Sequence, residues 1–200
     1  MNIRFLGIAA SLAAVSLAGA ATFDIDTAHS SAGFKVRHMM ISNVKGEFRK
    51  TSGTVDFDPS NLAASSIKAT IDVNTISTRE DKRDAHLKSP DFFDVAKYPT
   101  ITFESSKITA AGNNKYKATG NLTLHGVTKE VTLDVETTPE VKLGKGESRF
   151  GASASTKINR KDFGLTWNRA LDGGGVVVSD EVEISIDVEL VKKSAQKTTD

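Results

Sequence analysis

The stretch "EVEISIDVEL" (residues 181–190) decides the fold. Its apolar residues occupy every second position and are Val182, Ile184, Ile186, Val188 and Leu190. Successive side chains of a strand point to opposite faces, so this period of two predicts a strand with one apolar and one polar face. Antiparallel sheets with one face toward water show this alternation, whereas parallel sheets covered on both faces do not.

The same alternation recurs along the chain. It is present in "GFKVRH" (33–38), "IKATIDV" (67–73), "TITF" (100–103), "GNLTLHG" (120–126) and "EVTLDVE" (130–136). Turn-forming residues separate these stretches, as in "FDPSN" (57–61) and "LGKGES" (143–148). We expect about eight or nine antiparallel strands, near residues 22–27, 30–38, 44–57, 65–76, 99–110, 115–125, 128–138, 147–158 and 180–192. Such strands close into a barrel or stack as a sandwich.

Two stretches favour helix. Ser77 and Glu80 have the spacing of a capping box at the start of "STREDKRDAHL" (77–87). In "SPDFF" (89–93), Ser89 is placed to cap a second, short helix that begins at Pro90. The segment 159–180 has no clear period and is expected to be an irregular connection before the last strand.

The first 20 residues, "MNIRFLGIAASLAAVSLAGA", have the pattern of a secretory signal peptide. Arg4 supplies the positive charge, an apolar run follows, and Ala18-Gly19-Ala20 has the small residues of a cleavage site. The apolar run is short for a membrane-spanning helix, which needs ~20 residues. We therefore expect cleavage after about Ala20 and export to the periplasm, with one domain at 21–192 and a polar tail at 193–200.

Composition narrows the function. Removal of Arg4 with the leader leaves 25 of the 26 basic residues, equal to the 25 acidic ones. A neutral chain has no long-range attraction to nucleic acid or to an anionic membrane, so we expect no nucleic-acid partner and no stable membrane insertion. Cysteine is absent, which excludes thiol catalysis, thiolate metal sites and iron–sulfur clusters.

No motif for catalysis, a metal or a cofactor stands out. The four histidines, His29, His38, His86 and His125, lack metal-ligand spacing. The sequence has no GxSxG elbow, and "GGG" (173–175) lacks the Lys and the following helix of a phosphate loop. Asp91 and Asp94 beside Phe92-Phe93 are better explained by a helix start and a polar surface. We expect no enzyme activity, metal or cofactor.

The aromatic residues leave two interpretations open. Phe34, Phe57 and Phe103 share the apolar faces of their strands. They belong either to an ordinary filled core or to the wall of a small ligand cavity, because an eight-stranded barrel is just wide enough for either. Periodicity does not distinguish a filled barrel from a hollow one.

Four segments together closely resemble the YceI family of bacterial proteins. They are "TAHSSAGFKVRHMMISNVKGEF" (27–48), "STREDKRDAHLKSPDFFDVAKYPTITFES" (77–105), "GNLTLHGVTKEVTLDV" (120–135) and "NRKDFGLTWNRALDGGGVVVSDEVEISIDVEL" (159–190). The resemblance implies an all-β fold, an elongated antiparallel eight-stranded lipocalin-like barrel with one or two short helices near the mouth. It also implies binding of polyisoprenoid or similar amphiphilic lipids, often in the periplasm.

Alternation and motif position together suggest a binding site. We expect Phe34, Val36, Phe57, Ile71, Phe103, Leu122 and Leu124 to line the interior. We expect Phe92, Phe93, Phe163 and Trp167 to guard a mouth, and His38, Arg79 or Arg83 to meet a polar head group. The function expected is a periplasmic carrier of a polyprenol, polyprenyl phosphate or quinone tail. Alternatives are a filled barrel with a stress or interaction role and, less favoured, an enzyme acting on a bound lipid; a homodimer is possible.

Overall fold

The computed structural model describes residues 20–144 and 147–193, which form twelve strands and one α-helix. The expected leader up to residue 19 and residues 194–200 of the expected tail lie outside the described residues. Among the described residues, no helix has the length and apolarity needed to cross a bilayer.

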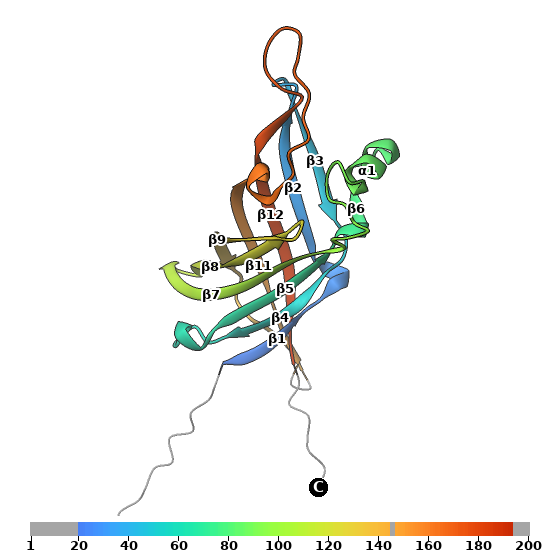
Figure 1. Ribbon diagram of the computed structural model, residues 1–200. Helices are drawn as coiled ribbons and strands as arrows, with labels where there is room; N and C mark the ends of the chain where they lie inside the picture. Colours follow the sequence, from blue (N-terminus) through green and yellow to red (C-terminus); the bar gives the residue numbers. More distant parts are fainter. Residues whose placement is uncertain (1–19, 145–146, 194–200) are drawn as a thin grey trace, which may run out of the picture.

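Eight strands close into an antiparallel barrel (Figure 1). In order around the barrel they are β11 (Glu147–Asn159), β9 (Val127–Thr137), β8 (Lys115–Leu124), β7 (Thr100–Gly112), β5 (Ser66–Asp72), β4 (Thr51–Phe57), β1 (Ala21–Ile25) and β12 (Val178–Lys192). The pairing of β11 with β12 closes the ring. The all-β, eight-stranded antiparallel barrel predicted from alternation is therefore confirmed, and the sandwich is not formed.

The long strand β12 makes the molecule elongated. One edge of β12 pairs with β11 over its length, while the other edge pairs with β1 near Leu190 and with β2 (Ser31–His38) from Val178 to Asp187. Strand β3 (Ser42–Phe48) adds to β2, and the two-residue β6 (Ile76–Ser77) adds to β3. These strands carry the sheet beyond the barrel to the β2–β3 turn (Figure 1). Strand β10 (Val141–Gly144) extends β11 at the other end.

The strand expected at residues 44–57 is two strands, separated at Arg49 and Lys50. The chain changes partner here, since β3 pairs with β2 and β4 pairs with β1. Phe48 and Thr51 flank the break and are both buried. A continuous strand cannot bury two residues three positions apart on one face, so the break is what allows both to point inward.

The strand expected at 65–76 is also interrupted. Strand β5 ends at Asp72, whose carboxylate accepts a hydrogen bond from the backbone N–H of Asn74 at 3.0 Å and so begins a short 3-10 turn over Val73–Thr75. This turn leads into β6. A side chain that bonds the backbone two residues on competes with the strand ladder, and a period-two pattern does not reveal this competition.

One of the two expected helices forms. Helix α1 (Asp81–Lys88) has Glu80 as its N-cap residue, whose carboxylate accepts bonds from the backbone N–H groups of Lys82 and Arg83. Ser77 lies in β6 and is not the cap. The second helix, expected to begin at Pro90, is wrong: the backbone N–H of Phe93 bonds back to the carbonyl of Leu87, so this segment closes the end of α1 as a series of turns.

Two apolar clusters fill parts of the interior. The larger joins Phe48, Ile101, Phe103, Leu122 and Leu133 with neighbouring residues. The smaller, at the end of the barrel near β1, contains Phe23, Ile25, Val55, Phe150 and Leu190. Residues of both clusters line the cavity that forms the candidate site.

Candidate functional site

A cavity of about 240 Å³ lies inside the barrel. A single ordered water needs only ~10–15 Å³ of such space, so the barrel is hollow and the interpretation as a filled core does not hold. The five apolar residues of "EVEISIDVEL" all lie in the cavity wall. The wall extends from Phe150 and Leu190 near β1 to Val36 and Val178, where β2 and β12 approach the far end.

The wall is apolar almost throughout. Five of its residues carry hydroxyl groups, and they are Thr51, Thr102, Tyr116, Thr137 and Thr156, of which Thr102 is exposed. The hydroxyl of Thr51 is buried and makes no hydrogen bond within the described part of the chain. Ligand sites typically combine a mostly apolar lining with a few polar groups, and this wall has that character.

Nine of the residues expected to bind a ligand lie in the cavity wall. They are Phe34, Val36, Phe57, Ile71, Phe92, Phe93, Phe103, Leu122 and Leu124. The first two come from β2, and the others come from the barrel strands and from the segment after α1. Their contact with a ligand stays a prediction.

The three polar residues expected at a head group lie outside the cavity wall. His38 is the last residue of β2, beyond the end of the cavity, where it pairs with Val178. Arg79 is exposed in the loop before α1. The Arg83 guanidinium is turned to Thr78, donating to its hydroxyl at 2.8 Å and to its carbonyl at 2.9 Å. Thr78 is the local partner of the Arg83 guanidinium, and contact of these three side chains with a head group stays a prediction.

Two of the four aromatic residues expected at a mouth are also outside the wall. Phe163 is only 2% exposed and is packed within the larger core cluster. Trp167 lies behind Phe92, with ring centroids 5.1 Å apart, and also contacts His86 at 5.1 Å. Trp167 therefore supports Phe92 from outside the cavity. The irregular segment 159–180 has no period from which its inward face could be predicted.

Phe92 and Phe93 close one side of the cavity. Leu87, near the end of α1, lies in the wall with them. The Phe93 ring makes an edge contact with the buried Phe48 ring, at 5.6 Å between centroids, and so joins the turns after α1 to β3. Phe92 and Phe93 therefore form part of the cavity wall on the side of α1.

Arg160 is the charged residue of the wall, and sequence reasoning missed it. It is 3% exposed, and its Nε donates to the Ser179 carbonyl at 2.9 Å while Nη1 donates to the Leu165 carbonyl. Asp180 Oδ1 lies 3.6 Å from Nη2. Burial lowers the pKa of Arg160, and Asp180 partly opposes this. Its hydrogen bonds tie the two ends of the irregular segment together.

The carboxylates beside Phe92 and Phe93 have structural partners. Asp91 accepts a hydrogen bond from His86 Nε2 at 2.9 Å. Asp94 is 7% exposed and pairs with Lys97 Nζ at 3.0 Å, and this hydrogen bond raises the pKa of Lys97. The expected helix start at Asp91 and exposed surface at Asp94 are therefore wrong, and each carboxylate is paired with a basic side chain instead.

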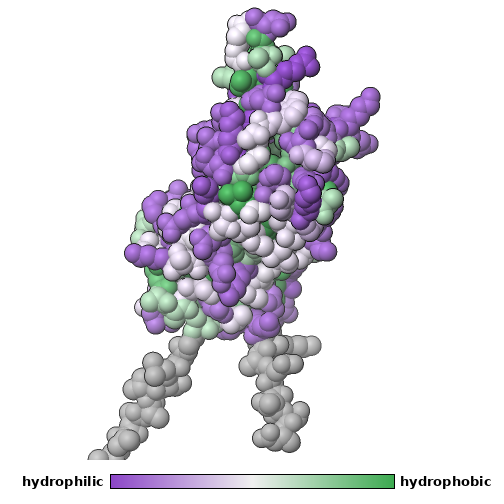
Figure 2. Space-filling model, in the orientation of Figure 1, coloured by the Kyte–Doolittle hydropathy of each residue, from purple (hydrophilic) through white to green (hydrophobic). Residues whose placement is uncertain are grey.

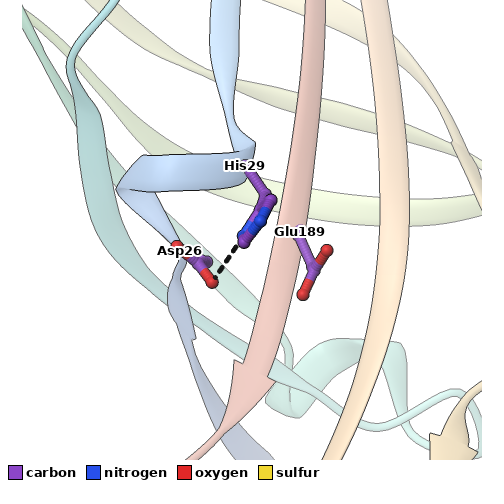
Figure 3. A group of neighbouring side chains, drawn as sticks. All are labelled: Asp26, His29 and Glu189. Atoms are coloured by element: carbon purple, nitrogen blue, oxygen red, sulfur yellow. Dashed lines mark hydrogen bonds and ion pairs between the residues drawn. The ribbon is translucent and has the colours of Figure 1, made fainter.

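A separate polar cluster lies on the outside of the barrel, where Asp26, His29 and Glu189 approach one another (Figure 3). Two hydrogen bonds to the Asp26 carboxylate lower its pKa, the first from His29 Nδ1 at 3.0 Å and the second from the backbone N–H of Ala28. The bond between His29 and Asp26 also raises the pKa of His29. Arg149 Nη1 lies 3.1 Å from Asp26 and 2.6 Å from Glu189. A guanidinium bonded to both carboxylates satisfies them as an ion-pair network, which disfavours a cation in the same place.

Comparison with known proteins identifies relatives across most of the chain. The sequence profile of the YceI-like domain matches residues 23–190. A UPF0312 protein of Vibrio cholerae is 37% identical over 166 residues, which cover 82% of this chain and 88% of that protein. A UPF0312 protein of Staphylococcus aureus is 37% identical over 168 residues, covering 84% and 95%.

Solved structures share the fold. The crystal structure of BcnA of Burkholderia cenocepacia matches with a TM-score of 0.71 and 31% identity, covering 82% of this chain and 98% of that one. A YceI protein of Campylobacter jejuni matches with a TM-score of 0.68 and 37% identity, covering 80% and 91%. A domain of Saccharophagus degradans described as polyisoprenoid binding matches with a TM-score of 0.63 at 17% identity, covering 87% and 99%.

Proposed function

The chain belongs to the YceI family, and we propose that it binds one long apolar lipid of the isoprenoid type inside its barrel. The observation that carries the proposal is the cavity of about 240 Å³ with its apolar wall. Each CH₂ group transferred from water into such a wall gains ~0.8 kcal/mol, so a long chain has a strong driving force to enter.

The composition of the wall suits a branched chain. Phenylalanine rings such as Phe34, Phe57 and Phe103 alternate with aliphatic side chains such as Ile71 and Leu122. Methyl branches and double bonds of an isoprenoid contact both kinds of surface well. The fold shared with a domain described as polyisoprenoid binding is in keeping with the proposal, although at 17% identity that likeness concerns the fold alone.

We further propose that the protein acts in the periplasm as a carrier and not as an enzyme. The leader pattern of the first 20 residues supports export. A tube that hides an apolar chain from water is what movement of such a lipid between membranes requires. The polar groups of the wall are hydroxyls and the Arg160 guanidinium, which already donates to backbone carbonyls.

Identification of bound compounds tests the proposal. The protein is purified from its native source without denaturant and analysed by native mass spectrometry, before and after addition of a polyprenol. We expect an apolar compound at one per chain. Repeated purification with no apolar ligand, together with no uptake of the added polyprenol, would overturn the proposal.

A matched pair of variants on β7 locates the binding. Phe103 is 8% exposed and lies in the cavity wall, whereas Thr109 is exposed on the same strand. Phe103→Asp places a charge in the cavity and should abolish uptake, while Thr109→Asp should leave it unchanged. Uptake by a folded Phe103→Asp variant would show that the inward face is not the binding surface.

A further inference from the structure

We propose that one end of the molecule docks on the surface of a phospholipid bilayer, where the barrel loads and releases its lipid. This end consists of the β2–β3 turn, Met39–Ile41, and the neighbouring part of the irregular segment, residues 170–177; we call it the tip. Figure 1 shows the tip projecting from the molecule at the end opposite β1. Such docking presupposes the lipid binding proposed above, because the cargo must come from a membrane.

The tip exposes three consecutive large apolar side chains. Met39 is 40% exposed, Met40 55% and Ile41 77%. Single apolar residues on a surface are ordinary, but a contiguous group on a projecting turn marks an interaction site. In Figure 2 the tip shows hydrophobic residues, in green, between hydrophilic ones. Methionine has a flexible side chain that adapts to an irregular apolar partner.

The backbone of the turn is unfavourable for these residues. The turn is closed by a hydrogen bond from the Ile41 N–H to the His38 carbonyl at 3.1 Å, and its two central residues have φ of +50° at Met39 and +63° at Met40. His38 pairs with Ser42 across these three residues, and a turn with positive φ at both central positions favours Gly, Asn and Asp. Methionine at both positions costs stability and exposes apolar surface, so folding alone does not explain the choice.

The cavity wall reaches the strands that lead to the tip. Val36 and Val178 belong to the cavity wall and lie on the strands that lead to the tip. The Met39 N–H donates to the Val177 carbonyl at 2.8 Å, which ties the turn to the segment beside it. A lipid chain that leaves the cavity at this end therefore emerges beside the exposed methionines.

The charges around the tip suit a surface of lipid phosphates. Arg37 and Arg169 are exposed beside the tip, and neither forms an ion pair within residues 20–144 and 147–193. Arg37 Nη2 donates to the Met40 carbonyl at 3.0 Å, which holds the guanidinium next to the turn. Asp172 is the exposed carboxylate of the same loop. Guanidinium groups bind phosphate well, so two of them around an apolar turn favour a bilayer.

Flotation with vesicles tests the docking. The purified protein, with its N-terminus defined by intact mass, is mixed with vesicles of phosphatidylcholine and phosphatidylglycerol. The test variant, Met39→Asn with Met40→Gly, suits the turn and should unfold at a urea concentration equal to or above that of the wild type. The control, Val141→Ser with Leu143→Ser, removes two side chains that are each 57% exposed on β10, at the other end of the molecule.

We expect the tip variant to lose about tenfold or more of its vesicle binding, because two apolar side chains no longer enter the bilayer. The β10 variant should bind as the wild type does. Equal binding by the folded tip variant, or no binding by the wild type, would overturn the docking. Vesicles of phosphatidylcholine alone should bind less protein, because the arginines then meet no excess negative charge.

A second measurement separates failure of docking from failure of lipid binding. Loading with a fluorescent polyprenol from detergent micelles needs no bilayer, so the tip variant should load to the same extent as the wild type. Its transfer of the same probe between vesicles should be about tenfold slower or more, in line with the lost contact. Absence of loading in every protein would refute the proposed function, and flotation would still decide the docking. Normal transfer by the tip variant would refute the docking alone.

Discussion

Replacement of Arg160 by methionine should destabilise the protein strongly. Arg160 is 3% exposed and makes two strong hydrogen bonds to carbonyls, through Nε to Ser179 at 2.9 Å and through Nη1 to Leu165. Hydrogen bonds from a charged group contribute ~1.5–3 kcal/mol each, and methionine keeps only the apolar packing of the stem. We expect a loss of about 3–5 kcal/mol in the free energy of unfolding, which also reflects the cost of leaving buried carbonyls without donors.

Urea and thermal unfolding measure this loss. For a domain of this size each kcal/mol lowers Tm by ~2–4 °C, so Arg160→Met should lower it by about 10 °C. Lys161→Met is the control, since Lys161 pairs with the same Asp180 at 3.0 Å but is exposed, and such pairs contribute ~0–1 kcal/mol. A loss below about 1 kcal/mol for Arg160→Met, or equal losses for both variants, would refute the role of this buried guanidinium.

Two further effects follow from local contacts. The hydrogen bond to Asp26 raises the pKa of His29, so its contribution to stability is present below the unfolded value of ~6.5 and is lost as pH rises through the folded pKa. Asp26→Asn should lower the pKa of His29 in an NMR titration, and an unchanged value would contradict the pairing. Gly126 has φ of +74°, and a Cβ there would lie 2.5 Å from the Tyr98 ring, so Gly126→Ala should cost ~1–2 kcal/mol or more in denaturant unfolding. Gly173→Ala, in open space, should cost less than about 0.5 kcal/mol; equal costs would refute the strain at Gly126.

The barrel could be predicted because its strands bury one face each. In β12, the five alternating apolar residues all line the cavity, so the period of two was read directly from the sequence. Closure by β11 and β12 needs pairing between strands and was implied by the resemblance to a family. Alternation did not distinguish a filled barrel from a hollow one, because the inward side chains are apolar and occupy every second position in both.

The parts that were missed have no period. Arginine is usually exposed, and it is seldom buried without partners, so nothing in the sequence indicated that Arg160 lies inside the protein. Its partners are backbone carbonyls, which no sequence motif marks. Trp167 was expected at the mouth because it is aromatic, yet its register in an irregular segment is set by packing on Phe92. The interruption at Arg49 and Lys50 depends on a change of strand partner, which local sequence does not show.

Filling the cavity tests the central claim most directly. Ala154 lies in the cavity wall on β11, and Ser155 is exposed beside it, so Ala154→Phe and Ser155→Phe add the same ring to opposite faces of one strand. The measurement is the affinity for a polyprenol by native mass spectrometry, with folding checked by circular dichroism. We expect Ala154→Phe to weaken binding by about tenfold or more, since losing room for two CH₂ groups at ~0.8 kcal/mol each suffices, and Ser155→Phe to leave it unchanged. Equal affinities in two folded variants would contradict binding inside the barrel.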